Sequence, residues 1–329
     1  MKKSGPGHEP PTEATGRRIQ AAARGLFERL PLNETAKERL RTALRSRLRQ
    51  PYGAGQHSAA LSSASSSTSA TDKSGNKGPS IDFVCNVCGT KIHNCPVSQI
   101  DREVASCHAC GSSVRMRSIV HLLSTALHGR SIALPDWPVN KAIKGVGLSD
   151  WHGYASRLPA KVDYINTYFH TEPFLDICNP PEKYTGAFDF VISTEVYEHV
   201  PPPASRAFAA TFKILKPGGA FVFTVPFTNE AETLEHYPLL DRYEIVKFDD
   251  EYVLVNRRKD GEYELHTKPA FHGGPGTTLE MRVFCRADII RQLEAAGFAD
   301  ITVMEKPYLE MGIIHNHPWS LPILARKPA

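Results

Sequence analysis

The sequence predicts an α/β fold with a mostly parallel central sheet, preceded by a small module built on cysteine pairs. Between residues 141 and 305, strand-like apolar runs alternate with helix-like runs, which is the rhythm of parallel strands joined by crossover helices. Ahead of this region, Cys85-x2-Cys88 and Cys107-x2-Cys110 form two pairs that are separated by 18 residues. These two observations together define the fold class.

The predicted elements follow one another without an internal repeat. Helices are expected at 119–127, 205–215 and 287–296, and strands at 141–148, 164–168, 188–193, 220–225, 301–305 and about 321–326. We expect a seven-stranded sheet with an antiparallel last strand. A longer stretch, at about 227–280, contains further strand-like runs and a predicted hairpin turn at 259–262, and it is expected to cover a ligand pocket.

Composition divides the 329 residues into four regions. Residues 1–52 read as a basic helical arm, 53–80 as a Ser-rich linker that is expected to be disordered, 81–112 as the cysteine module, and 113–329 as the α/β domain. The arm carries 12 Lys and Arg against five Asp and Glu, a net charge of +7, so the remaining residues carry −3. The basic charge therefore belongs to the arm, and the main domain offers no general argument for nucleic acid.

The location of the protein is predicted from what the chain lacks. No run of 18 apolar residues is present, so no membrane-spanning helix is expected. Met1 to Pro6 have no apolar stretch behind them, which disfavours a secretory signal peptide. We therefore expect a cytoplasmic protein without a membrane partner, and the sequence predicts no oligomeric state.

The two cysteine pairs have the spacing of a tetrathiolate zinc site formed by Cys85, Cys88, Cys107 and Cys110. Each C-x-x-C turn aims two thiolates at one ion, and Gly89 and Gly111 stand where such turns need a positive φ. Two disulfides or four buried thiols are the alternatives, and a cytoplasmic chain disfavours the disulfides. Because four protein ligands close the coordination sphere, a Zn²⁺ ion here would be structural.

Three motifs in the main domain occur in a specific order. They are Phe188-Asp-x-Val-Ile-x-x-Glu-Val-x-Glu-His-Val200, Leu215-Lys-Pro-Gly-Gly219 and Ala295-Ala-Gly-Phe298. With them, residues 141–326 resemble the class I S-adenosylmethionine (SAM)-dependent methyltransferases, of the type 11-like group. Cys107-x2-Cys-Gly-Ser-x2-Arg-x-Arg117 ahead of this domain resembles a bacterial subfamily with an N-terminal zinc ribbon. The resemblance implies a Rossmann-like sheet and SAM as cofactor.

The resemblance also implies cofactor-binding residues. The glycine-rich loop after the first strand is reduced to Gly145 and Gly147, with Ser149 or Asp150 expected to supply polar contacts. The second strand lacks the usual acid for the ribose, which leaves Asn166 or Thr167 as substitutes. Further along the chain, Asp176 matches the residue that accepts from the adenine amine, Ile177 would pack on the base, and Glu195 would face the methionine amine.

The chemistry of methyl transfer leaves the acceptor open. The leaving group is neutral, so the site mainly has to hold nucleophile and methyl group in line. A hydroxyl acceptor also needs a base, for which His199 is the candidate, although it could equally be a helix-start residue. We expect a small-molecule or glycan acceptor. The alternatives are an RNA acceptor, bound through the cysteine module and the basic arm, and a non-catalytic zinc-stabilised binding module.

Overall fold

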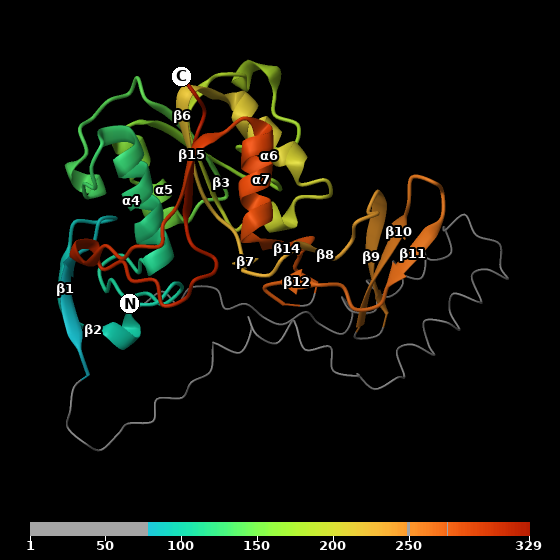
Figure 1. Ribbon diagram of the computed structural model, residues 1–329, viewed down its shortest axis with the longest axis horizontal. Helices are drawn as coiled ribbons and strands as arrows, with labels where there is room; N and C mark the ends of the chain where they lie inside the picture. The colour runs from blue at the N-terminus through green and yellow to red at the C-terminus, as the bar shows by residue number, and fades with distance from the viewer. Residues whose placement is uncertain (1–77, 249–250, 275) are drawn as a thin grey trace, which may run out of the picture. The chain divides into compact units, whose positions relative to one another are not determined.

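The computed structural model describes residues 78–248, 251–274 and 276–329 (Figure 1). The predicted basic arm, and all but the last residues of the predicted linker, lie outside this range. The chain divides into two compact units, of which the larger comprises 76–238 and 280–329 and the smaller includes 239–279. Among the described residues, none of the helices combines the length and apolar character needed to cross a bilayer.

The larger unit is built on a mixed sheet with the strand order β15-β16-β6-β5-β3-β4. The bounds are β3 Lys144–Leu148, β4 Asp163–Thr167, β5 Phe188–Thr194, β6 Leu215–Thr224, β15 Ala299–Val303 and β16 Ile323–Arg326. Strands β4, β3, β5 and β6 are parallel to one another, whereas β16 runs antiparallel to both β6 and β15. The predicted α/β class and the antiparallel last strand are therefore confirmed.

Within the described residues this sheet has six strands, so the predicted seventh is wrong. The segment after β4 that would supply it forms only one isolated parallel bridge, between Tyr168 and Phe174. Pro173 in this segment has no N–H to donate to a ladder, which works against a regular strand. As a result β4 lies at the edge of the sheet.

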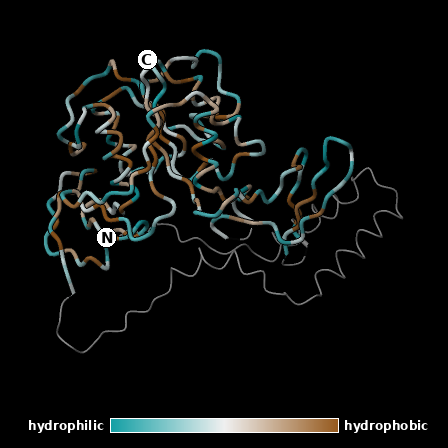
Figure 2. The backbone as a smooth tube through the Cα atoms, in the orientation of Figure 1, coloured by the Kyte–Doolittle hydropathy of each residue, from teal (hydrophilic) through white to brown (hydrophobic). Residues whose placement is uncertain are grey.

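Helices cover both faces of the sheet (Figure 1). Helix α4 (Val114–His128) packs on one face and helices α6 (Ser205–Ile214) and α7 (Arg286–Ala296) on the other, and α5 (His152–Ala155) is a single turn after β3. The strands alternate accordingly, because neighbouring side chains point to opposite faces. Phe190 and Ile192 belong to the α4 side, and Phe221 and Phe223 to the α6–α7 side. The central strands are mainly hydrophobic (Figure 2).

The cysteine module begins with an antiparallel hairpin of β1 (Ser80–Val84) and β2 (Lys91–Pro96). The module is not a separately folded domain, because Phe83, Val87 and Ile92 belong to the same buried cluster as Ile119 of α4 and Phe190 of β5. The module and one face of the sheet therefore share a hydrophobic core.

The three strand-like runs that the sequence showed in the 227–280 stretch, at 243–248, 252–256 and 263–266, form strands of the smaller unit, and further short strands that were not predicted lie in both units. In the larger unit, β7 (Phe227–Thr228), β14 (Arg282–Cys285) and β8 (Leu234–Glu235) form a small three-stranded sheet. In the smaller unit, β9 (Arg242–Phe248), β10 (Glu251–Arg257) and β11 (Tyr263–His266) form an antiparallel meander, and β12 (Phe271–His272) pairs with β13 (Thr278–Leu279). The predicted turn closes through a hydrogen bond from Arg258 N to Glu262 O.

Candidate functional site

The carboxyl ends of the parallel strands meet at one edge of the main sheet, where ligands bind in open α/β folds. Ser149 follows β3 and Glu195 follows β5, and each has a φ of 55°. A positive φ is uncommon outside glycine and is a sign of local strain. Ser149 N donates to Thr167 O at 2.7 Å and Glu195 N to Thr224 O at 2.9 Å, so the neighbouring strand holds each of the two turns. Two strained turns thus lie at neighbouring strand ends.

Gly145 and Gly147 lie inside β3, and not in a loop after it as the sequence suggested. A Cβ atom at Gly145 would lie 1.9 Å from the ring of Phe190, and one at Gly147 would lie 2.0 Å from the Tyr164 hydroxyl. Both glycines are therefore needed because aromatic side chains cross the strand. The predicted turn is formed by Ser149 and the residue that follows it.

Asn166 and Thr167 fasten the turn after β3. The Asn166 side chain accepts from Asp150 N at 2.9 Å and donates to Asp150 O at 3.0 Å, which fixes both backbone groups of that residue. The buried Thr167 hydroxyl donates to Gly147 O at 2.7 Å. In this structure, therefore, both proposed ribose ligands use their side chains to shape the loop.

Asp150 is buried under this turn and is hydrogen-bonded to two tyrosines. The hydroxyl of Tyr164 lies 2.7 Å from Oδ2, and that of Tyr154 lies 3.0 Å from Oδ1. Burial raises the pKa of Asp150 from 3.8 to about 7, although both tyrosine hydroxyls favour the charged form. Asp150 therefore supports the turn from beneath, and its carboxyl group does not face solvent.

Asp176 and Ile177 follow the residual bridge beside β4. The Asp176 carboxylate accepts from Cys178 N at 2.9 Å and from Asn179 Nδ2 at 2.6 Å, which orders the turn around it. Ile177 is buried against the core on the α6–α7 side of the sheet. The structure thus gives Asp176 a fixed carboxylate at the edge of the domain.

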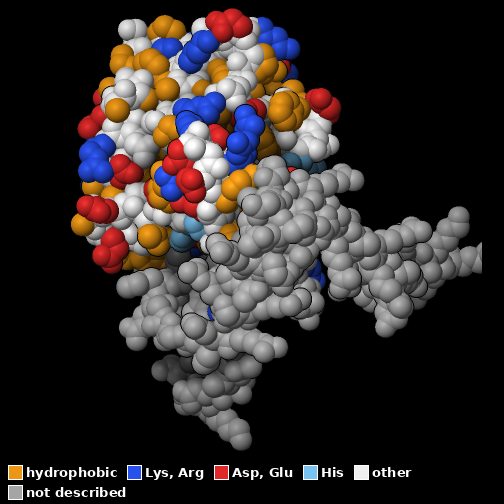
Figure 3. Space-filling view, turned by 90° about the vertical axis from the view of Figure 1, so that its right-hand side faces the viewer, with side chains coloured by type: hydrophobic (Ala, Val, Ile, Leu, Met, Phe, Trp, Pro, Cys, Tyr) orange, Lys and Arg blue, Asp and Glu red, His pale blue; other side chains and the backbone are white. Residues whose placement is uncertain are grey.

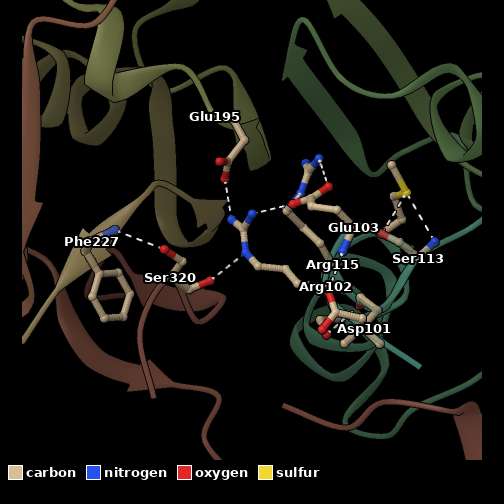
Figure 4. Close-up of polar contacts among 11 residues, drawn as sticks. Asp101, Arg102, Glu103, Ser113, Arg115, Glu195, Phe227 and Ser320 are labelled. Atoms are coloured by element: carbon tan, nitrogen blue, oxygen red, sulfur yellow. Dashed lines mark hydrogen bonds and ion pairs between the residues drawn. The ribbon is translucent and has the colours of Figure 1, made fainter. Parts of the chain in front are cut away.

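Glu195 is held by an arginine that sequence reasoning did not identify (Figure 4). Nη2 of Arg102 donates to Oε1 of Glu195 at 2.7 Å, and Nε of Arg102 donates to Ser320 O at 3.1 Å. Burial raises the pKa of Glu195, but the positive charges of Arg102 and Arg115 outweigh this effect and keep the pKa below 4.5. The cysteine module thus supplies the countercharge of an acid at the end of β5.

Arg115 belongs to the same group of charges. Its guanidinium donates to both oxygens of Glu103, at 2.7 and 2.8 Å, and Glu103 also pairs with Arg102 (Figure 4). Arg115 could have been found from the Arg-x-Arg pattern after the second cysteine pair. Arg102 carries no such signal, because it stands alone between the two pairs.

His199 ends the short 3-10 helix η6 (Tyr197–His199), which begins two residues after Glu195. Its Nε2 atom lies 3.7 Å from Oε1 of Glu198, a fully buried acid. Burial raises the pKa of Glu198 well above 4.5, and the nearby charge of Glu195 acts in the same direction. The imidazole is mostly buried and lies in the segment directly after β5.

A hollow opens beside Arg102. It is lined by the module, by the start of α4 and by the segment before β16, namely Asp101, Arg102, Val114, Arg115, Ile314, His315, Asn316, His317, Trp319, Ser320, Leu321 and Pro322. The rings of His317 and Trp319 stack with their centroids 4.8 Å apart and an interplanar angle of 19°. Burial and the charge of Arg102 lower the pKa of His315 to about 4, so this imidazole is neutral at pH 7. The hollow therefore combines polar side chains with aromatic rings.

The four cysteines of the module come together as the spacing predicted. Cys85 Sγ lies 3.6 Å from Cys110 Sγ, Cys88 Sγ lies 3.7 Å from Cys107 Sγ, and all four sulfur atoms lie within 4.8 Å of one another. Zinc–sulfur bonds near 2.3 Å in a tetrahedron would separate the sulfur atoms by about 3.8 Å. A disulfide would need about 2.05 Å, so the arrangement fits a zinc ion and not two disulfides.

The backbone of both cysteine turns agrees with this arrangement. Gly89 has a φ of 79° and Gly111 a φ of 74°, as predicted. Their N–H groups donate to Cys85 O at 2.7 Å and to Cys107 O at 2.8 Å, which closes each turn over the sulfur atoms. The two halves of the site are therefore built alike.

Comparisons with known proteins bear on the α/β domain. A family model described as a methyltransferase domain matches residues 100–267, about half of the chain. A search of curated proteins gives no match.

Three solved structures illustrate the likeness. A SAM-dependent methyltransferase from Clostridium acetobutylicum is 14 % identical, with 56 % of this chain and 84 % of that chain covered and a TM-score of 0.33. The 1,6-didemethyltoxoflavin-N1-methyltransferase of Burkholderia thailandensis is also 14 % identical, with 64 % and 79 % covered and a TM-score of 0.35. CalS10, an amino pentose methyltransferase from Micromonospora echinaspora, is 12 % identical, with 66 % and 92 % covered and a TM-score of 0.37.

The family match spans the module's second cysteine pair, the strands β3 to β6 and the motif around Glu195. It therefore covers the strand ends at which the candidate residues gather. The chain belongs to the methyltransferase-domain family and is a SAM-dependent methyltransferase of class I.

Proposed function

We propose that the protein transfers a methyl group from SAM to a small polar molecule or a glycan that binds in the hollow beside Arg102. The observation that carries the proposal is the pairing of Glu195 with Arg102 at the strand edge, 2.7 Å apart, next to this hollow. Methionine presents an ammonium and a carboxylate, and a neighbouring carboxylate and guanidinium match both charges. The residues present therefore fit the cofactor.

The proposed cofactor contacts extend along the strand ends. Glu195 would bind the methionine ammonium, and Arg102 or Arg115 its carboxylate. Asp176 would accept from the adenine amine, with Ile177 beneath the base. The turn at Ser149 would contact the methionine part of SAM. Asn166 and Thr167 would act indirectly, by holding this turn in place. When bound, SAM supplies an electrophilic methyl group on a sulfonium ion.

The walls of the hollow support this choice of acceptor class. Trp319 and His317 offer stacked rings, and Asp101 and Asn316 offer polar groups beside them. Flat aromatic surfaces with polar neighbours suit a sugar or another polar ring. For a hydroxyl acceptor, we propose His199 as the group that receives the proton, since an imidazole suits this role near neutral pH.

We also propose that Cys85, Cys88, Cys107 and Cys110 hold one structural zinc ion, which the distances between their sulfur atoms support. An RNA acceptor would depend on the basic arm, which lies outside the described residues. On the face shown in Figure 3, Lys and Arg side chains lie interspersed with Asp and Glu. This face offers no observation in favour of RNA.

The test is binding of S-adenosylhomocysteine by calorimetry to the wild type and three variants. We expect micromolar binding that weakens at least tenfold in Glu195→Gln and Asp176→Ala. Glu182→Gln is the matched control, because Glu182 is also a paired acid but its partner is Lys213 at 2.7 Å and not one of the arginines proposed to bind the cofactor. If the folded, zinc-loaded wild type does not bind, the proposal is wrong. If it binds, methyl transfer to a panel of sugars and small polar compounds comes next.

A further inference from the structure

Arg117 is a fully buried cation without a carboxylate partner. It lies in the first turn of α4, and its guanidinium donates to Ser112 O, Ser106 Oγ and Gly312 O, each at 2.8 Å. All three acceptors are uncharged, and no ion pair joins Arg117 to a carboxylate within the part of the chain that the structure describes. Arginine stays protonated in proteins, so this burial is costly unless a negative charge lies nearby.

The cysteine site lies next to Arg117 and can supply negative charge. The Ser112 hydroxyl lies 3.2 Å from Cys85 Sγ and 3.3 Å from Nη1 of Arg117, so it bridges the two groups. The side chain of Asn86, within the first cysteine pair, donates to Arg117 O at 2.8 Å. Four thiolates around one Zn²⁺ carry a net charge of −2, whereas four protonated thiols carry none. The zinc-bound site would thus supply the countercharge of Arg117.

The other side of Arg117 faces the segment that lines the hollow. Gly312 O accepts from Arg117, and residues 314–317 and 319–322 form one wall of the hollow. Two hydrogen bonds join the module to the same segment. Asn316 Nδ2 donates to Ile100 O at 2.9 Å, and Arg102 donates to Ser320 O. Three hydrogen bonds, at Gly312, Asn316 and Ser320, therefore tie this wall to the module and to the start of α4.

We propose that Arg117 is a positioning residue that couples zinc occupancy to the wall of the acceptor hollow. The negative zinc–thiolate centre stabilises the buried guanidinium, and the guanidinium holds Gly312 in place. When the metal leaves, the guanidinium loses its countercharge, and the segment from Gly312 to Ser320 loosens. The inference rests on the zinc site and the acceptor hollow of the proposed function.

The first measurement is the zinc affinity of the full-length chain, by competition with a chromogenic chelator. We expect Arg117→Met to weaken zinc binding about 10- to 100-fold, as for other partners of metal ligands, and Arg117→Lys, which keeps the charge, to recover most of the loss. Arg282→Met is the matched control. Arg282 is also fully buried, but it pairs with Glu235 at 2.7 Å and has none of the four ligand cysteines among its partners.

The second measurement is hydrogen exchange in the wild type with and without zinc, which stays informative if Arg117→Met does not fold. We expect metal removal to speed exchange at least tenfold in residues 312–320 and to leave α7, on the opposite face of the sheet, nearly unchanged. Wild-type zinc affinity in Arg117→Met, or unchanged exchange in 312–320 after metal removal, would overturn the coupling while leaving the zinc site intact. A wild type that binds no zinc would overturn both the coupling through Arg117 and the proposed zinc site.

Discussion

Asp150 provides the sharpest test of the structure, through the pH dependence of stability. Its carboxyl group is 5 % exposed, and burial raises its pKa from 3.8 to about 7. An acid whose folded pKa is raised binds more protons in the folded than in the unfolded chain between these two values. Asp150 therefore makes its full favourable contribution to the free energy of unfolding below pH 3.8, and this contribution is lost as the pH rises to about 7.

The size of this effect follows from the two pKa values. At about 1.4 kcal/mol per pKa unit, the difference between 3.8 and about 7 corresponds to a loss of about 4 kcal/mol. About 2.5 kcal/mol of this loss lies between pH 5 and pH 8. Asp150→Asn has the shape of the protonated acid and keeps a partner for Tyr154 and Tyr164, so it should escape this loss.

The assay is urea denaturation of the wild type and Asp150→Asn across pH 5 to 8. The difference between the two free energies of unfolding isolates Asp150, because all other titrating groups are common to both proteins. We expect Asp150→Asn to gain about 2.5 kcal/mol on the wild type over this interval. A difference that stays constant with pH would refute the account of a buried, protonated Asp150.

Two further predictions concern the cysteine module. Gly312→Ala should destabilise the protein by about 1–3 kcal/mol more than Gly186→Ala, as measured by denaturation. Both glycines have a positive φ, but only at Gly312 would a Cβ atom meet a ring, that of Phe83, at 2.6 Å. Equal losses of stability in the two variants would contradict this packing. We expect elemental analysis to find about one zinc ion per chain in the wild type and to find it lost in Cys107→Ser. Cys178→Ser, whose residue lies outside the cluster, should keep the zinc. Retained zinc in Cys107→Ser would contradict the proposed ligand set.

Patterns that are local in the chain were read correctly from the sequence. The cysteine spacing predicted the cluster of four sulfur atoms, and Gly89 and Gly111 have the predicted positive φ. Periodicity located the strands of the main sheet, and the three longer strands of the 227–280 stretch, to within a few residues. These signals are local because a turn, a strand or a helix is formed by residues close together in the chain.

Other predictions failed because they depended on distant neighbours. The glycines at 145 and 147 read as part of a loop, but they lie in strand β3, where the rings of Phe190 and Tyr164 leave no room for a Cβ atom. The seventh strand is missing because the segment around Pro173 forms one bridge only. Nothing local announced that Arg102 would reach Glu195, 93 residues further along the chain.

The sequence by itself determined the fold class, the cysteine site and the family to which the chain belongs, since each is written in spacing and order along the chain. Only the tertiary structure decided which charges meet. Arg102 pairs with Glu195, Arg117 lies between the cysteine cluster and Gly312, and Asp150 is buried beneath a turn. The physical reason is that burial and countercharge depend on packing between residues that are far apart in sequence, and no local pattern encodes them.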